Sequence, residues 1–295
     1  MGDGFDDLVA EADAAPVDGW DFSWLDGRAT EQRPSWRYAH AMGERMAQAA
    51  VALDIQTGGG EVLATVPRLA PRTVATESWR PNLSRAAALL GPRGVAVVAA
   101  DDGTTLPFAA DTFDLVVSRH PVTTCWDEIG RVLTPEGSYF SQQVGPASVG
   151  ELVEFFLGPQ PARSRLQRHP DRARAAAEGA GLQVVDLQVE SLHTEFRDVG
   201  AVIYFLRKVI WMVPNFTVDE YRPRLRALHD HIQARGPFQA HTVRFLIEAR
   251  KPGRTGPKRP ASDARGAASD TDFRGDGCAG CDAGRSPRRR GFPRG

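Results

Sequence analysis

The chain has 295 residues, 42% of them hydrophobic and 25% charged, which is enough to bury a core of ordinary size. Its formal net charge is −1, and basic residues outnumber acidic ones only from residue 252 onward, so the preceding body is acidic. An acidic body does not attract phosphate backbones, which disfavours nucleic acid as a partner. No apolar run reaches the roughly 18 residues of a membrane span, and the N-terminus lacks a signal-peptide pattern. We therefore expect a cytoplasmic protein without a membrane partner.

The first 44 residues are unusually rich in aromatic side chains. Three tryptophans, a phenylalanine and a tyrosine lie between residues 20 and 38, among them Trp36 and Tyr38. Because aromatic faces attract cations, we expect residues 1–44 to form a cap or lid in which Trp36 and Tyr38 contact substrate. Ordinary packing of these rings onto the core is the alternative. A helix is predicted over residues 37–48.

Residues 50–143 alternate strand patterns with helical patterns. Strands are predicted over residues 50–55, 73–76, 95–99, 113–118 and 138–143, and helices over 60–68, 81–90 and 125–133. This alternation implies a parallel sheet with helices on both faces and all strand ends along one edge. Ligands of open α/β sheets bind at that edge. Five polar residues lie there: Asp54, Glu77, Asp102, Ser118 and Gln142.

The region beyond residue 143 is expected to supply substrate recognition. A helix is predicted over residues 170–180, a sixth strand over 182–189 and a last strand over 238–249. The stretch 198–235 between the last two strands reads as helical, with a capping box at Thr217 and Glu220. We expect this stretch to be an insertion over the edge of the sheet, although its apolar face also fits ordinary core packing.

The tail over residues 252–295 has the composition of a disordered segment. Pro and Gly make up 14 of its 44 residues, and it has few apolar side chains to bury. Its two cysteines, Cys278 and Cys281, form a lone pair without a second ligand pair or a nearby His, so no metal site is predicted. Three cysteines in a chain of this length do not make a disulfide framework.

The stretch over residues 52–61, Ala-Leu-Asp-Ile-Gln-Thr-Gly-Gly-Gly-Glu, is the strongest functional signal. An apolar strand ends at a carboxylate, a glycine turn follows, and a helical pattern begins. Glycines admit positive φ and let a ligand approach the backbone closely. This pattern indicates a site for a nucleoside-bearing ligand.

Five segments in the same order resemble the class I S-adenosylmethionine-dependent methyltransferases: residues 53–61, 76–78, 102–108, 113–117 and 128–137. The resemblance implies a methyltransferase domain over residues 45–251. Its fold would be a Rossmann-like sheet of seven mostly parallel strands, with the last strand antiparallel, helices on both faces and a helical insertion before the last strand. The resemblance also implies S-adenosyl-L-methionine as the cofactor.

The family's cofactor contacts carry over to particular residues of this chain. The glycine turn would pass under the methionine part of the cofactor, Glu77 would accept the ribose hydroxyls, and Asp102 would accept from the adenine amino group. A carboxylate has two acceptor oxygens, which suits a vicinal diol. The full set of expected cofactor-binding residues is Asp54, Gln56, Gly58, Gly60, Glu77, Asp102, Gly103 and Ser118.

Gln56 departs from the family pattern, because members of the family commonly have glycine at this position. Its side chain either intrudes on the methionine part of the cofactor or forms a hydrogen bond with the methionine carboxylate or a neighbouring loop. Gly58 and Gly60 are intact, and Gly59 adds conformational freedom. We therefore expect cofactor binding to be retained, with a non-binding site as the alternative.

Residues after the fourth strand are the candidates for acceptor chemistry. His120 is the best candidate for a general base, because its ordinary pKa lies near neutrality, although a structural role is the alternative. Arg119 is expected to neutralise an anionic acceptor or the methionine carboxylate, and Gln142 to bind polar groups. Together with Trp36 and Tyr38, these two residues make up the expected substrate-binding set.

The expected function is in-line transfer of a methyl group from S-adenosylmethionine to a small-molecule acceptor. A non-catalytic binding module with the same fold is an alternative, motivated by Gln56. A methyltransferase acting on RNA or protein is another, and the acidic body counts against RNA. The fold does not decide the acceptor atom.

Overall fold

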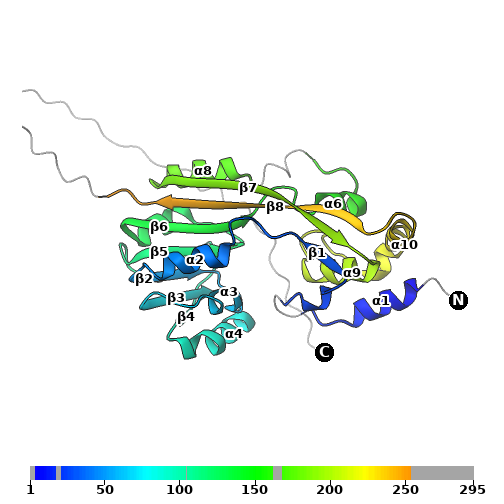
Figure 1. Cartoon of the computed structure of the whole chain (residues 1–295), viewed down its shortest axis with the longest axis horizontal. Helices are drawn as coiled ribbons and strands as arrows, with labels where there is room; N and C mark the ends of the chain where they lie inside the picture. Colours follow the sequence, from blue (N-terminus) through cyan, green and yellow to red (C-terminus); the bar gives the residue numbers. More distant parts are fainter. Residues whose placement is uncertain (1–3, 18–20, 104, 162–167, 254–295) are drawn as a thin grey trace, which may run out of the picture. The chain divides into compact units, whose positions relative to one another are not determined.

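A sheet of eight strands runs through the described part of the chain, in the order β1-β7-β8-β6-β5-β2-β3-β4 (Figure 1). The computed structural model describes residues 4–17, 21–103, 105–161 and 168–253. Five strands form the parallel part of the sheet: β2 (Val51–Ile55), β3 (Arg72–Glu77), β4 (Ala96–Ala99), β5 (Phe113–Arg119) and β6 (Leu133–Val144). These are the five strands that the alternating pattern predicts.

Three antiparallel strands complete the sheet beyond β6. The last strand, β8 (Phe238–Arg250), pairs antiparallel with both β6 and β7 (Gln183–Phe196), as predicted. The eighth strand, β1 (Ala29–Glu31), is the difference from the seven strands expected, and it pairs antiparallel with the end of β7. Three residues are too few to show a strand pattern, so β1 exists because β7 extends past its predicted end at residue 189 and presents an edge to it.

Helices cover both faces of the sheet. One face carries α2 (Tyr38–Met46), α3 (Glu61–Ala64) and α4 (Arg80–Leu90), which pack on alternate strand residues such as Ala52 and Leu115. The other face carries α5 (Trp126–Val132) and α8 (Pro170–Gly179), which pack on Leu53 and Val116. Because side chains alternate along a strand, neighbouring residues of β2 belong to opposite cores.

A third core lies where β7 and β8 extend beyond the other strands (Figure 1). It joins α1 (Phe5–Ala14) and α6 (Gly150–Leu157) to the predicted insertion, which forms α9 (Val199–Lys208) and α10 (Val218–Arg235). At the start of α10, Thr217 Oγ1 accepts from the amide of Glu220 at 3.2 Å, which is the Thr217 half of the predicted capping box. We call α1, α6, α9, α10 and the outer halves of β7 and β8 the cap.

The N-terminal segment is divided between two cores. Phe5 and Val9 of α1 are buried in the cap, whereas Tyr38 and Met42 of α2 are buried against the sheet. The described residues form one compact unit. The division of the chain at residues 44 and 251 stays a prediction, and the predicted disorder of the tail, with Cys278 and Cys281, lies outside the described residues. No helix in the described ranges is long and apolar enough to cross a membrane.

Candidate functional site

A crevice opens at the carboxyl ends of the parallel strands, at the point where the order of the strands in the sheet reverses. From β2 the chain builds outward through β3 and β4, then returns to place β5 on the other side of β2. The crevice between these strand ends is narrow and open to solvent. Four of the predicted cofactor residues line it: Gln56, Asp102, Gly103 and Ser118. A point of this kind is where open α/β sheets bind ligands.

The glycine turn lies beside the crevice and has the backbone that its sequence predicts. Gly58 and Gly60 have φ values of 67° and 86°, in the left-handed region that favours glycine. Gly60 also has no room for a side chain, because an added Cβ would lie 2.9 Å from the side chain of Leu90 on α4. These glycines therefore shape the turn and let α4 pack closely against it.

Asp54 lies under the glycine turn and is 6% exposed. Its Oδ2 accepts a hydrogen bond from Thr57 Oγ1 at 2.7 Å, which fixes the carboxylate against the turn. Burial, with a smaller contribution from the negative charge of Glu77, raises the pKa of Asp54 to about 7. Asp54 does not line the crevice.

Glu77 at the end of β3 ties the glycine turn to the start of α4. Its Oε2 accepts from the amide of Gly58 at 2.8 Å, and its Oε1 accepts from the amides of Ser78 and Trp79 at 2.9 and 2.8 Å. Burial raises the pKa of Glu77 despite these bonds. A carboxylate has about four lone-pair sites, so about one remains for a ligand hydroxyl.

Asp102 and Gly103 form the rim of the crevice beyond β4. Ser78 Oγ donates to Asp102 Oδ2 at 3.1 Å, and the negative charge of Asp102 contributes to the raised pKa of Glu77. The two carboxylates thus lie near each other at the strand ends, and their shared role in cofactor binding stays a prediction. Gly103 has a φ of 84°, which brings its backbone over the crevice near Thr123.

Gln56 binds the loop that follows β5. Its Oε1 accepts from the amide of Val122 at 2.6 Å, and its Nε2 donates to the carbonyl of Thr123 at 2.7 Å. The side-chain amide of Gln56 thus makes two hydrogen bonds with the backbone of the loop, one as acceptor and one as donor. Of the alternatives open for Gln56, this is the contact with a neighbouring loop. Its backbone has a φ of 57°, a conformation in which glycine is more usual.

Ser118 belongs to a buried group of hydroxyls at the floor of the crevice. Its Oγ lies 2.7 Å from Tyr139 Oη and 2.9 Å from Ser141 Oγ, both on β6. Its carbonyl accepts from Tyr38 Oη at 2.8 Å. Tyr38 is buried and stacks on Phe140, so its ring supports the sheet at this point. Its predicted contact with substrate stays a prediction.

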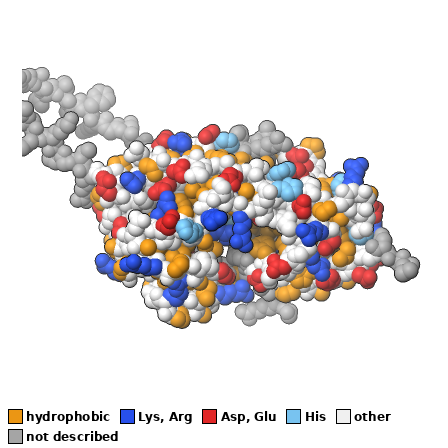
Figure 2. Space-filling view, viewed as in Figure 1, with side chains coloured by type: hydrophobic (Ala, Val, Ile, Leu, Met, Phe, Trp, Pro, Cys, Tyr) orange, Lys and Arg blue, Asp and Glu red, His pale blue; other side chains and the backbone are white. Residues whose placement is uncertain are grey.

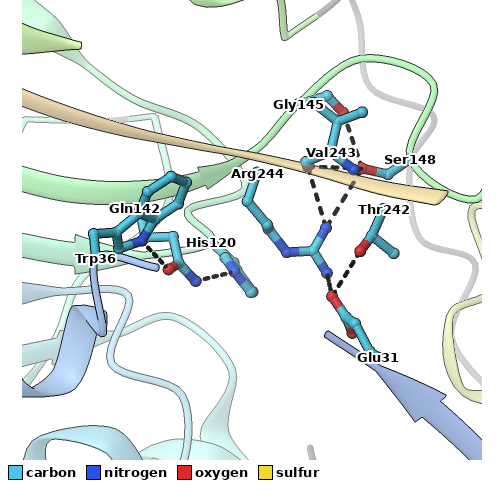
Figure 3. A network of polar contacts seen from close by, with 9 residues as sticks. All are labelled: Glu31, Trp36, His120, Gln142, Gly145, Ser148, Thr242, Val243 and Arg244. Carbon is cyan, nitrogen blue, oxygen red and sulfur yellow. Dashed lines mark hydrogen bonds and ion pairs between the residues drawn. The ribbon is translucent and has the colours of Figure 1, made fainter. Parts of the chain in front are cut away.

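His120, Gln142 and Trp36 form a hydrogen-bonded chain next to the crevice (Figure 3). Trp36 Nε1 only donates, so Gln142 Oε1 must accept from it, at 2.7 Å. The amide Nε2 of Gln142 then faces His120 Nε2 at 2.9 Å, and this ring nitrogen must be an acceptor. His120 is therefore neutral, with its proton on Nδ1.

The surroundings of His120 keep the ring neutral. Burial, followed by the positive charges of three nearby arginines, holds the pKa of His120 well below its ordinary value. The backbone of His120 has a φ of 54°, in the left-handed region. The lone pair that a general base needs is engaged by Gln142, so the geometry favours hydrogen-bond donation from Nδ1.

Sequence reasoning missed a second polar group, on β8 and β1. Arg244 donates to Glu31 at 2.7 Å, and Thr242 Oγ1 donates to the same carboxylate oxygen at 2.9 Å (Figure 3). Arg244 also donates to Ser148 Oγ at 3.4 Å. The available signal was an arginine inside the apolar run of residues 238–249, but nothing local in the sequence pairs it with Glu31.

Comparisons with known proteins agree with this fold. Residues 53–141 match the family model described as a methyltransferase domain, and no curated protein matches the chain in sequence. A candidate methyltransferase from Bacillus halodurans is similar in structure, with 19% identity, a TM-score of 0.51, and coverage of 72% of this chain and 98% of its own. The YcgJ protein of Bacillus subtilis has 14% identity and a TM-score of 0.51, covering 74% and 99%.

The structural comparisons and the topology of the sheet show a Rossmann-like methyltransferase fold, as the sequence predicts. The family model and the fold agree, since both indicate a methyltransferase domain that includes residues 53–141.

Replacing Gln56 by Ala is expected to lower the free energy of unfolding by about 1–2 kcal/mol, because two side-chain hydrogen bonds are lost. Gln56→Gly is expected to lower the free energy of unfolding by less, since glycine removes the strain of the left-handed backbone at this position, which costs roughly 1 kcal/mol. Denaturant unfolding measures both values, and hydrogen exchange at the Val122 amide reports the loop. Unchanged exchange at Val122 in the Ala variant would show that Gln56 does not hold the loop.

Proposed function

We propose that this chain binds S-adenosylmethionine in the crevice and transfers its methyl group to a small acceptor. The observation that carries the proposal is the position of two carboxylates, Glu77 and Asp102, beside a glycine turn. This turn lies at the point where the order of the strands in the sheet reverses. The match of residues 53–141 to a methyltransferase-domain model supports the same function.

The residues present fit this cofactor. Glu77 keeps about one lone-pair site for a ribose hydroxyl, and the carboxylate of Asp102 is an acceptor at the rim. The buried carboxylate of Asp54 supplies negative charge beneath the turn, which favours a cationic ligand. When bound, S-adenosylmethionine would supply an electrophilic methyl group on a cationic sulfur.

The remaining work of the chain is to position the acceptor and to exclude water. We place the acceptor beside Trp36 and His120, whose chain of hydrogen bonds through Gln142 holds both side chains in place. Figure 2 shows a hollow near the middle of this face with Lys and Arg side chains at its border. A hollow supports a small acceptor over a macromolecule, which would need a more open surface.

In this proposal His120 donates a hydrogen bond from Nδ1 to the acceptor. The pH profiles of the wild type and of His120→Asn are then expected to have the same shape, with a lower kcat in the variant, because His120 stays neutral. Initial rates from pH 5.5 to 8.5 measure this. Loss of an ascending limb in His120→Asn alone would instead mark His120 as the general base.

Calorimetry with S-adenosylmethionine tests the proposed function directly. We expect one molecule to bind per chain, and a metabolite panel followed by mass detection of a methyl gain then identifies the acceptor. Absence of binding would refute the enzyme proposal and favour a non-catalytic module. That second candidate is supported by Gln56, which lines the crevice where the family commonly has glycine. The cytoplasmic location stays a prediction.

A further inference from the structure

A separate hollow lies on the face of the sheet that α5 and α8 cover, and we call it the α8 hollow. It has a volume of about 220 Å³ and is open to solvent. Its apolar wall contains two buried aromatic rings, Trp126 of α5 and Phe245 of β8. Beside them is Val122, which follows β5 and is 67% exposed. An exposed valine next to two aromatic rings is a surface on which a flat apolar ligand can pack.

The polar wall of the α8 hollow is basic. Arg168 and Arg172 lie on either side of the first residue of α8, and both are exposed. His169 accepts from the amide of Asp171 through Nδ1 at 3.2 Å, so the neutral ring has its proton on Nε2 and can donate there. Among the described residues that line the hollow, none is a carboxylate. The wall therefore attracts an anion and offers it hydrogen-bond donors.

Gln143 of β6 adds an unmatched donor to the same wall. Its Nε2 is buried, and no atom of the described residues completes a hydrogen bond with it. The side chain is near enough to Tyr139 to counteract the rise that burial causes in the pKa of that hydroxyl, but Tyr139 Oη already lies 2.7 Å from Ser118 Oγ. Rotation of the amide about its last side-chain bond would turn the donor toward a ligand oxygen, which is favoured because a buried donor without an acceptor destabilises the protein.

The α8 hollow and the proposed cofactor crevice share the loop that follows β5. Pro121 and Thr124 line both spaces, so this loop is the wall between them. On the crevice side, Gln56 forms hydrogen bonds with the backbone of Val122 and Thr123. On the other side, Val122 lines the α8 hollow. A ligand packed on Val122 therefore restrains the loop that Gln56 holds beside the crevice.

We propose that the α8 hollow is a second ligand site, which binds a small aromatic acid and, when occupied, strengthens cofactor binding in the neighbouring crevice. The ring packs on Trp126, Phe245 and Val122, and the carboxylate accepts from Arg168 and Arg172. Two ligands that restrain one loop favour each other's binding, because the second finds the loop already ordered. The effect on the cofactor rests on the proposed function, whereas binding of the acid does not.

Calorimetry on the full chain without cofactor tests the site. Benzoate is expected to bind at least about tenfold more tightly than benzamide, which has a similar shape without the charge. Arg172→Gln is expected to weaken benzoate binding about fivefold. The matched control is Arg174→Gln, which removes the same charge from the same helix at a position that does not line the hollow, and it should leave benzoate binding unchanged. Equal binding of benzoate and benzamide, no binding of either, or equal losses in the two arginine variants overturns the inference.

Titration of S-adenosylhomocysteine with and without saturating benzoate tests the effect on the cofactor. Benzoate is expected to raise the affinity at least about fivefold. Gln56→Ala should keep benzoate binding and lose most of this rise, because the loop is no longer held on the crevice side. An unchanged or lower affinity overturns the proposed effect.

Incubation with S-adenosylmethionine distinguishes this site from the acceptor site. A methyl gain on benzoate, found by mass detection, would show that the α8 hollow holds the acceptor and would overturn the inference. We expect no such gain, because the acceptor is placed beside Trp36 and His120. Failure of the wild type to bind S-adenosylmethionine while it still binds benzoate counts against the proposed function and the effect on the cofactor, and leaves the acid site standing.

Discussion

Replacing Asp54 by Asn is expected to stabilise the protein at pH 8 and to change its stability little at pH 4. The pKa of Asp54 is about 7 in the folded chain against an ordinary value of 3.8, so the folded state holds a proton that the unfolded state releases between these values. That protonation stabilises the fold fully below pH 3.8, and its contribution is lost as the pH rises through 7. A shift of this size corresponds to roughly 4 kcal/mol at most.

Denaturant unfolding of the wild type and of Asp54→Asn, at intervals from pH 4 to pH 8, measures this difference. Asparagine keeps an oxygen that can accept from Thr57 Oγ1, so the turn should retain its shape. Asp26→Asn, at an exposed turn, is the control and should give a curve parallel to the wild type. A parallel curve for Asp54→Asn as well would mean that Asp54 titrates normally. The gain in stability is expected to come with weaker cofactor binding, since the negative charge is removed.

Replacing Glu77 by Ala is expected to weaken S-adenosylmethionine binding by at least about a hundredfold and to lower the free energy of unfolding by roughly 3 kcal/mol. Three backbone amides, those of Gly58, Ser78 and Trp79, would lose their acceptor at once. The glycine turn and the start of α4 would lose their common link. Calorimetry and denaturant unfolding measure the two effects.

Glu77→Gln separates the effect on cofactor binding from the effect on stability. Its oxygen can still accept from Ser78 and Trp79, but its NH₂ group would face the amide of Gly58, donor against donor. We expect it to lose most of the cofactor affinity and only part of the stability. Glu44→Gln is the control, because Glu44 is an exposed carboxylate on α2 that does not line the crevice, and this variant should keep the full cofactor affinity. Full affinity in Glu77→Gln would show that the link to Gly58 has no part in binding.

Sequence reasoning predicts the parallel sheet well because its signals are local. Apolar runs mark the strands, and the polar residues that follow them, such as Glu77 and Asp102, meet at one edge because parallel strands end together. The length of β7 was underestimated, since its outer half alternates with polar residues and is held by β8 and by the cap, whereas the predicted bounds of β8 agree with the structure to within one residue. Pairing between distant segments decides such ends.

The contacts of the candidate site were harder to predict. Gln56 binds backbone groups 66 and 67 positions along the chain, and no local pattern shows which loop its amide will reach. His120 was expected to act as a base from its ordinary pKa, but burial and the arginines around it change that value. Arg244 and Glu31 are 213 positions apart and meet only because β1 pairs with β7.

The shared core of the cap has a consequence for how the chain folds as it is synthesised. Phe5 and Val9 pack with Val202 of α9 and with Leu225 and Leu228 of α10, so α1 has no complete surface to bury against until α10 has been made. The parallel strands, in contrast, are contiguous in sequence from Val51 to Val144 and need only short loop closures. The parallel strands can thus collapse before α1 has its partners, and the cap assembles only after α10 has been made.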